Sequence, residues 1–463
     1  MTASVETVRQ PKFVKQTQWQ GYDNPVWDRR EKKRVTVLYS FVERRKSLFL
    51  RAYFMRHGYL FHDMGDHVKE DVRWGKEYGN RMECNPMYFT SGALIRNLKQ
   101  LEARGLSKDE IVDRFVFLGG GGQCGPCRYG MYPQEYLKVV NEAGFKGFRI
   151  LIFASDIFGP PPPSNSAFKI DLPFRINMLV AIVLADLLHE AECALRPRAR
   201  DRQQLLKALG KSERILLEAF ASRMFLIRVP EALRRVNRLL TEIGTRDAKL
   251  PQIFVTGEFF ANLAHNEGNY NLRRFIADEG CEVLPGLFSQ RVLYDNWRRL
   301  QEAKKGLKYA VSLKEKIHWI RSMIKQHASN TVVKLFYHWY RSALKSEDYG
   351  GRAHLLDLDE LAELAREYYH PEIFGGEGNL EIAEAIHYAG KCDGFISSKP
   401  FGCMASSGVS DGVQSKIMAK YPELDFLSIE TSGDNEVSIL GRVSMLLFKA
   451  KQKLNARVNG EHH

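Results

Sequence analysis

Two cysteines, Cys124 and Cys127, enclose a Gly-Pro pair that follows a strand-like run at residues 115–118 and four glycines at 119–122. Two thiols two residues apart at a strand-to-helix turn form either a redox dithiol or half of a metal site. Which of the two applies depends on the other residues that reach this turn.

Two further cysteines stand in comparable turns. Cys84 is followed by Asn85-Pro86, a pair that discourages regular structure, and Cys403 follows Pro400-Phe401-Gly402. Ligands of a doubly wound sheet collect at the carboxyl ends of its strands, so we expect all four thiols to reach one edge of the sheets. Four thiols on turns, rather than on apolar faces, favour a metal cluster.

The glycines near these thiols suit an iron–sulfur cluster. Such clusters are held by soft thiolates, and backbone N–H groups close to the sulfides stabilise their negative charge. Glycines at 119–122, 125 and 402 have no side chain and permit that close approach.

Two other interpretations stay open. Cys-Gly-Pro-Cys is also the dithiol of thioredoxin-like oxidoreductases, although Gln123 precedes it here instead of a tryptophan. Structural zinc would use the same four thiols, but it usually shows two close pairs, and only one pair is close here.

The remaining three cysteines stand at core-like positions. Cys193 lies inside a helical pattern, and Cys281 and Cys392 lie just ahead of strand-like runs. Buried free cysteine is common, so we expect all three to pack in the core.

Strand and helix patterns alternate along the chain. Strand-like runs stand at 34–40, 59–61, 115–118 and 148–153, with helical patterns between them. A second set is predicted at 252–256, 282–284, 394–397 and 426–429. The alternation predicts an α/β protein with two Rossmann-like parallel-sheet domains and helical insertions.

A run of prolines at 160–163, after Gly159, is the clearest break. We predict an N-terminal arm at 1–33, a first α/β domain at 34–165 and a helical segment at 166–250. The second α/β domain is expected at 251–455, with a helical insertion at about 292–345, and a tail at 456–463.

The chain has 463 residues, seven cysteines and a formal net charge of +13. We expect a cytoplasmic protein without a disulfide framework, because no apolar run could cross a bilayer and no secretory signal is visible. Much of the positive charge lies in helical patterns at 196–238 and 298–325. Solvated helix faces explain most such runs; the alternative is docking to an acidic protein or an anionic cofactor. Nucleic acid is a weaker alternative, because no nucleic-acid module is evident.

At these residues the chain resembles the 2-hydroxyacyl-CoA dehydratase superfamily of iron–sulfur proteins. The closer resemblance is to the branch found with the ATP-hydrolysing activators of those enzymes, and to the double-cubane cluster proteins. The matching strings are Cys84-Asn85-Pro86, Gly121 to Gly130, Val255-Thr256-Gly257-Glu258, Asp393-Gly394-Phe395 and Pro400-Phe401-Gly402-Cys403-Met404.

The resemblance implies a cluster in the cleft between two Rossmann-like domains, either a 4Fe–4S cluster or a double cubane. Its ligands would be Cys84, Cys124, Cys127 and Cys403, with Gly122, Gly125, Gly402 and Glu258 close by. It also implies low-potential electrons from a separate activator that hydrolyses ATP. In the family's dehydratases, one-electron reduction of a CoA thioester gives a ketyl radical that permits loss of the hydroxyl group.

Two departures from the family pattern bear on function. The glycine run at 119–122 is not followed by Gly-Lys-Ser/Thr and no ATPase-type glycine loop appears, so an activator must act in trans, and a double cubane needs more thiolates than four. We therefore expect an oligomeric protein that carries out a reductive reaction or a radical dehydration, with an acyl-CoA among the candidate substrates. The alternatives are a non-enzymatic electron carrier or scaffold and a thioredoxin-like oxidoreductase.

Overall fold

The structure is a computed structural model that describes residues 24–40, 42–121, 127–154, 167–168, 171–370, 372 and 376–460. Cys124, Gly122, Gly125 and the proline run lie outside the described residues.

The first domain is built on four parallel strands in the order β2-β1-β3-β4. They are β1 (Thr36–Tyr39), β2 (Leu60–Asp63), β3 (Phe115–Gly121) and β4 (Arg149–Ala154). Successive side chains of a strand point to opposite faces. Val37 and Val116 accordingly pack with α1 (Arg44–Arg56), while Leu38 and Phe117 pack with α3 (Asn85–Ala103) and α5 (Tyr132–Glu142). Helices α2 (Lys69–Tyr78) and α4 (Lys108–Arg114) complete the domain.

The second domain repeats this plan with the strand order β6-β5-β7-β8, again all parallel. Its strands are β5 (Gln252–Gly257), β6 (Glu282–Val283), β7 (Gly394–Pro400) and β8 (Phe426–Thr431). Helices α10 (Leu272–Asp278) and α16 (Glu436–Gly460) cover one face, and α13 (Leu358–Ala365), α14 (Gly378–Tyr388) and α15 (Asp411–Lys420) cover the other. Two parallel sheets with helices on both faces confirm the predicted α/β fold class.

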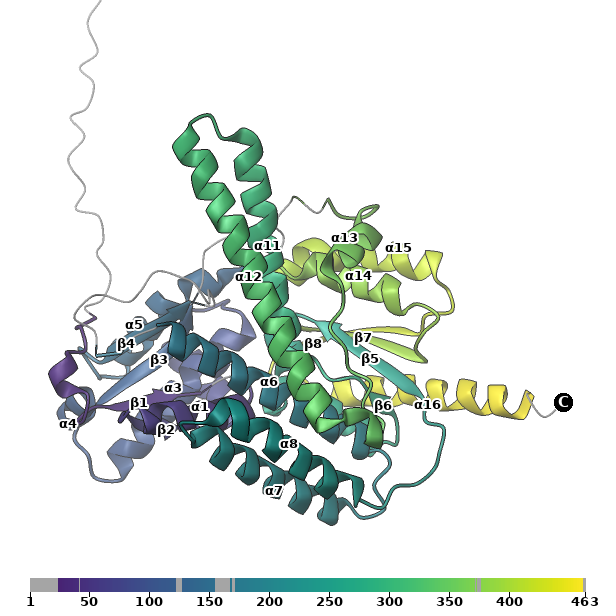
Figure 1. The fold of residues 1–463 in the computed structure, drawn as a ribbon, viewed down its shortest axis with the longest axis horizontal. Helices are drawn as coiled ribbons and strands as arrows, with labels where there is room; N and C mark the ends of the chain where they lie inside the picture. Colours follow the sequence, from purple (N-terminus) through teal and green to yellow (C-terminus); the bar gives the residue numbers. More distant parts are fainter. Residues whose placement is uncertain are drawn as a thin grey trace, which may run out of the picture.

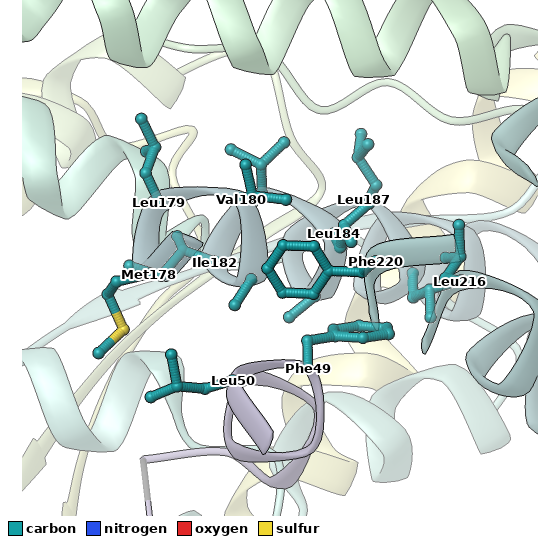
Figure 2. Close-up of a cluster of buried hydrophobic side chains, with 14 of the residues drawn as sticks. Phe49, Leu50, Met178, Leu179, Val180, Ile182, Leu184, Leu187, Leu216 and Phe220 are labelled. Atoms are coloured by element: carbon teal, nitrogen blue, oxygen red, sulfur yellow. The ribbon is translucent and has the colours of Figure 1, made fainter. Parts of the chain in front are cut away.

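A helical region joins the two domains. It contains α6 (Leu172–Leu195), α7 (Arg202–Ala221) and α8 (Phe225–Thr241), and α6 is buried along almost its whole length. Figure 2 shows Phe49 and Leu50 of α1 packing against Ile182 and Leu184 of α6, with Phe220 of α7 beside them. Helices α11 (Phe288–Tyr309) and α12 (Leu313–Leu344) form a long hairpin that stands out from the body (Figure 1).

Short elements complete the chain. They are α9 (Phe259–Leu263), the 3₁₀ turns η1 (Arg29–Glu31), η2 (Arg128–Met131), η3 (Glu267–Asn269) and η4 (Ser346–Tyr349), and the π turn η5 (Ser406–Ser410).

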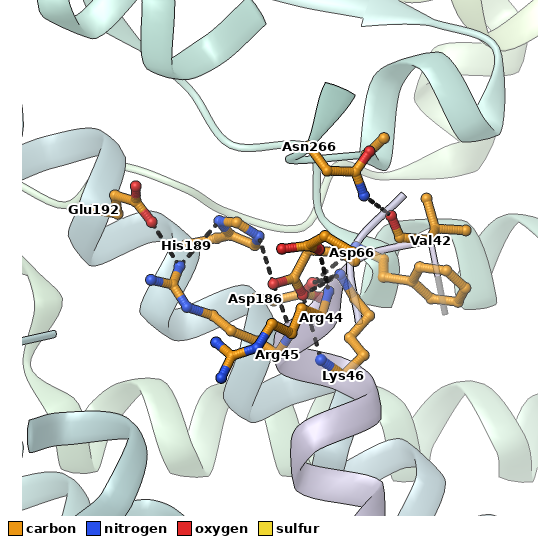
Figure 3. A network of polar contacts seen from close by, with 12 residues as sticks. Val42, Arg44, Arg45, Lys46, Asp66, Asp186, His189, Glu192 and Asn266 are labelled. Atoms are coloured by element: carbon orange, nitrogen blue, oxygen red, sulfur yellow. Dashed lines mark hydrogen bonds and ion pairs between the residues drawn. The ribbon is translucent and has the colours of Figure 1, made fainter. Parts of the chain in front are cut away.

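A buried polar network holds the helical region to both domains (Figure 3). Arg45 of α1 pairs with Glu192 of α6 at 2.8 Å, and its guanidinium lies 3.3 Å from His189 Nδ1. The ring of His189 lies 3.2 Å from that of His265 in the second domain, centroid to centroid. Asp186 of α6 accepts hydrogen bonds from Ser289 at the start of α11. This network therefore links α1 of the first domain to α6 and α11.

Four local expectations differ from the structure. Pro86 does not keep Cys84 in an irregular loop: it occupies the first turn of α3, where a missing N–H costs nothing. Strand β3 continues through Gly119 to Gly121 instead of ending before them, because these glycines pair with β4. Trp27, in the predicted arm, is fully buried, and α16 runs to Gly460, past the predicted end of the second domain.

Candidate functional site

Both sheets have a topological switch point, which is where parallel α/β proteins usually bind ligands. The chain leaves β1 and β3 in opposite directions across the first sheet, and β5 and β7 across the second. Cys127 follows β3, Glu258 directly follows β5 and Cys403 follows β7. Three of the predicted site residues therefore stand at these two points.

Cys84 is another predicted site residue that the structure describes. It lies at the N-terminal cap of α3 and contacts the second domain. The backbone N–H of Asn85 donates a hydrogen bond to the carbonyl of Phe401 at 3.1 Å. Gly402 has a φ of +75°, and a Cβ placed there would lie 3.3 Å from the Cα of Cys84. The turns that carry Cys84 and Cys403 are therefore in direct contact, although the residues are far apart in the chain.

Cys84 and Cys127 share a tyrosine-rich environment. The Cys84 sulfur lies 3.0 Å from the hydroxyl of Tyr132, and the Cys127 sulfur accepts a hydrogen bond from the N–H of Tyr129 at 3.4 Å. A charge on either sulfur would interact with the other and with Glu258. The two thiols therefore belong to one site.

Cys403 has its own hydrogen-bond partners. Its sulfur accepts a hydrogen bond from the backbone N–H of Ser406 and donates one to the Ser406 hydroxyl oxygen, both at 3.5 Å. Ser406 and Ser410 each donate to a different oxygen of Glu381 at 2.7 Å, which fixes the η5 turn. A backbone N–H that points at a sulfur stabilises the thiolate and tunes a bound metal centre.

Burial raises the pKa of all three thiols. It raises the pKa of Cys84 and of Cys127 to about 11, and that of Cys403 further still. Without a positive partner these groups are therefore protonated at neutral pH. A metal centre would bind the thiolates, so its binding would release protons.

Glu258, directly after β5, is the carboxyl group that interacts with all three thiols. Its carboxylate accepts hydrogen bonds from the N–H groups of Phe260 at 2.8 Å and Ala261 at 3.0 Å, which caps α9. Burial nevertheless raises its pKa to about 7. A carboxyl with that pKa can give or take a proton near neutral pH.

A cavity of about 170 Å³ lies beside Cys127. Cys127, Glu258, Tyr129, Tyr132, Phe259 and Arg291 are among its lining residues. Its walls come from the ends of both sheets, from α6 and from the first turns of α11. The cavity is mainly aromatic and aliphatic, with a few charged groups, which is typical of a small-molecule site.

Two arginines line this cavity: Arg175, which is buried, and Arg291, which is partly buried. Arg291 has the contacts that fix its position. It pairs with Asp295 at 3.3 Å and with Glu377, and its guanidinium lies 4.9 Å from the centre of the Phe259 ring. These contacts hold the side chain at the cavity wall.

The three sulfurs fit an iron–sulfur cluster by their chemistry. Each thiolate of a cluster binds a different iron, so the ligands need not converge on one point as the ligands of a single ion must. Among the residues that the structure describes, no group of three or more His, Cys, Asp or Glu side chains is close enough to hold a single metal ion. The soft sulfur donors and the nearby N–H and hydroxyl groups match what a cluster requires.

The structure thus brings together five of the eight predicted site residues: Cys84, Cys127, Cys403, Gly402 and Glu258. Cys124, Gly122 and Gly125 lie outside the described residues. Sequence reasoning missed Tyr132, Arg291 and Glu381. The signal for Glu381 was available, because acidic residues interrupt the apolar pattern of 378–388 at a spacing that places them on the buried face.

No protein-family model matches the chain, and no curated protein matches it at a significant level. Across the described parts of the chain, no helix has the length and apolar character needed to cross a membrane.

Proposed function

We propose that this chain is an iron–sulfur protein that receives low-potential electrons from a separate ATP-hydrolysing activator and uses them in a reductive reaction or a radical dehydration. Cys84, Cys127 and Cys403 would hold a 4Fe–4S cluster or a double cubane, with Cys124 as a further ligand. The resemblance to the 2-hydroxyacyl-CoA dehydratase superfamily motivates this assignment.

One observation carries the proposal. The turns that carry Cys84 and Cys403, from the two domains, are in direct contact, and Cys127 stands near Cys84 at the wall of a cavity. Thiols that serve only packing have no reason to gather at the ligand-binding edge of two sheets. A dithiol oxidoreductase would need only Cys124 and Cys127, and it would leave Cys84 and Cys403 unexplained.

When bound, the cluster would supply single electrons at low potential. The chain's own residues would do the rest. Glu258, with its pKa near 7, would hold or release a proton at the cavity wall. Arg291 would stabilise negative charge on a substrate, and the aromatic walls would exclude water from it.

The substrate assignment rests on this cavity and on the resemblance. A small carbonyl or thioester group would fit a mainly apolar cavity that has two arginines and a carboxyl of raised pKa at its wall. An acyl-CoA is the first candidate that the resemblance suggests.

The test begins with the full chain purified without oxygen and analysed for iron and acid-labile sulfide. We expect brown protein with about four irons, or about eight for a double cubane, and matching sulfide per chain. Colourless protein with a titratable disulfide between Cys124 and Cys127 would overturn the proposal in favour of a dithiol oxidoreductase.

A second experiment separates an enzyme from a carrier. The iron-loaded chain is mixed with an activator of the dehydratase family, ATP and a 2-hydroxyacyl-CoA, and loss of water is followed. We expect turnover that requires both activator and ATP and that falls at least tenfold in Glu258→Gln, without loss of iron. Reduction of the cluster without any conversion of substrate would identify an electron carrier.

A further inference from the structure

In the hairpin of α11 and α12, one face of α12 is buried against neighbouring helices and the opposite face is exposed to solvent. The buried positions of α12 include Ser329, Val333, Tyr337 and Tyr340, which face α11 and the helical region. Residues three or four apart lie on the same side of a helix, so these positions form one continuous face. The opposite face points away from the molecule.

That opposite face is apolar along most of the helix. A row of exposed side chains, here called the α12 stripe, consists of Leu313, Ile317, Ile320, Ile324, Val332, Leu335 and Trp339. Leu313 is 74 % exposed and Leu335 is 61 % exposed. At 1.5 Å per residue the stripe is about 39 Å long, which is far longer than scattered single apolar residues on a surface would give.

The tip of the hairpin is strongly basic. Residues 298–325 contain nine Lys and Arg against two Glu, a net charge of +7, out of +13 for the whole chain. The lysines at 304, 305, 308, 314 and 316 are all exposed. Basic side chains thus flank an exposed apolar row, and the surface is complementary to an acidic, amphipathic partner.

Charge decides among three possible occupants. A second copy of the hairpin is unfavourable, because residues 288–344 carry twelve Lys and Arg against three acids and like charges would meet in any register. An anionic membrane would engage the basic tip, but the stripe continues to Trp339, close to the end of α12 that is farthest from the tip. A helix lying along the hairpin covers the whole stripe.

We propose that the hairpin is a docking site for an acidic protein, which lays a helix with an apolar face and flanking Asp and Glu along the α12 stripe. This inference is independent of the proposed iron–sulfur function. It places the partner close to the cavity, because Arg291 and Asp295, which line the cavity, belong to the first turns of the same hairpin.

The test uses two synthetic helical peptides as long as the stripe, both with leucine at the stripe's spacing. One has glutamate on its flanks and the other has lysine, and binding to the full chain is measured by calorimetry. We expect the acidic peptide to bind at least tenfold more tightly and to lose affinity as salt is raised.

Two matched variants distinguish docking on the α12 stripe from non-specific binding to exposed apolar side chains. Ile317→Gln/Ile324→Gln/Leu335→Gln should weaken binding of the acidic peptide at least tenfold, whereas Val437→Gln/Met445→Gln/Phe448→Gln, on exposed positions of α16, should not. Both variants change exposed side chains, and circular dichroism checks that both fold. Cys127→Ala should bind as the unmodified chain does, which separates this inference from the cluster.

Three outcomes would overturn the proposal. The two peptides could bind equally, or the stripe variant could bind the acidic peptide as well as the α16 variant does. The stripe variant could instead lose self-association in sedimentation or lose binding to phosphatidylglycerol vesicles, which would assign the stripe to a second copy or to a membrane.

Discussion

Two groups of cysteines in this molecule are equally buried but differ in their neighbours. Burial raises the pKa of Cys84 and Cys127 to about 11, and it raises the pKa of Cys281 to about 11 and of Cys193 to about 12. The thiol pKa therefore does not distinguish a site from a core.

The neighbours do distinguish them. Cys127 and Cys403 follow the carboxyl ends of strands. Cys281 and Cys392 precede β6 and β7, at the opposite ends of the strands, and Cys193 packs within the apolar core of the second domain, as predicted. A site is recognised by where distant residues converge, and burial alone is not enough.

The largest difference between the two groups is expected when one thiol is removed from each. Cys127→Ala should lose most of the bound iron, because a cluster that lacks one thiolate is held weakly, whereas Cys193→Ala should keep it. Iron and sulfide are measured per chain after anaerobic purification. Equal iron content in the two variants would show that the grouping is wrong.

The carboxyls at this edge should give the chain an unusual dependence on pH. Burial raises the pKa of Glu258 and of Glu381 from 4.5 to about 7. Between these values the folded state binds more protons than the unfolded state, so the free energy of unfolding falls as pH rises. Burial of each ionised carboxylate should lower the free energy of unfolding by roughly 3 kcal/mol above about pH 7.

Urea unfolding of the metal-free chain at about pH 5 and about pH 8 measures this effect. Glu381→Gln should reduce the loss of stability between the two values. A variant that loses as much stability as the unmodified chain would mean that Glu381 is ionised in the fold.

The polar network at α1 and α6 should respond in the opposite direction. Burial lowers the pKa of His189 and His265 well below 6.5, and the cations Arg45, Lys46 and Arg274 lower it further. The unfolded state then binds protons that the folded state does not, so stability falls as pH drops below 6.5.

His189→Gln should weaken that acid sensitivity in the same unfolding experiment, with His354→Gln, an exposed position, as the control. Acid sensitivity that is the same in both variants would contradict the assignment of neutral, stacked imidazoles.

The smallest effect expected is that of a methyl group at the domain contact. Gly402 and Gly390 both have positive φ, but only at Gly402 would a Cβ approach another residue, Cys84. Gly390→Ala should cost about 1 kcal/mol from backbone strain alone. Gly402→Ala should cost more and should also lower the iron content, which Gly390→Ala should leave unchanged.

The fold was largely predictable because its signals are local. Short β-branched and aromatic runs bounded by glycine, such as 115–118 and 252–256, predicted strands that the structure contains. Glycine and proline beside Cys127 and Cys403 placed these thiols on turns. The prediction of an irregular loop at Cys84 was wrong, because the first turn of a helix accepts Pro86 as readily as a loop does.

The surroundings of the thiols were not predictable. Arg291 stands at the root of a helical hairpin more than one hundred residues away from either Cys84 or Cys403, and only the packing of α11 against α6 brings it to the cavity. The role of Tyr129 is visible only in the structure, where its hydroxyl packs directly against the backbone of Gly120. Tyr132 was likewise not predicted. Such contacts depend on how two sheets face each other, which local patterns do not encode.

The most direct test of convergence is a thiol footprint. The iron-loaded chain and the same chain stripped of iron are alkylated without oxygen, and each cysteine is quantified by mass spectrometry. The account predicts that removal of iron exposes Cys84, Cys127 and Cys403 together, with Cys124, while Cys193, Cys281 and Cys392 are unchanged. Protection of Cys124 and Cys127 alone, with Cys84 and Cys403 unaffected by iron, would contradict it.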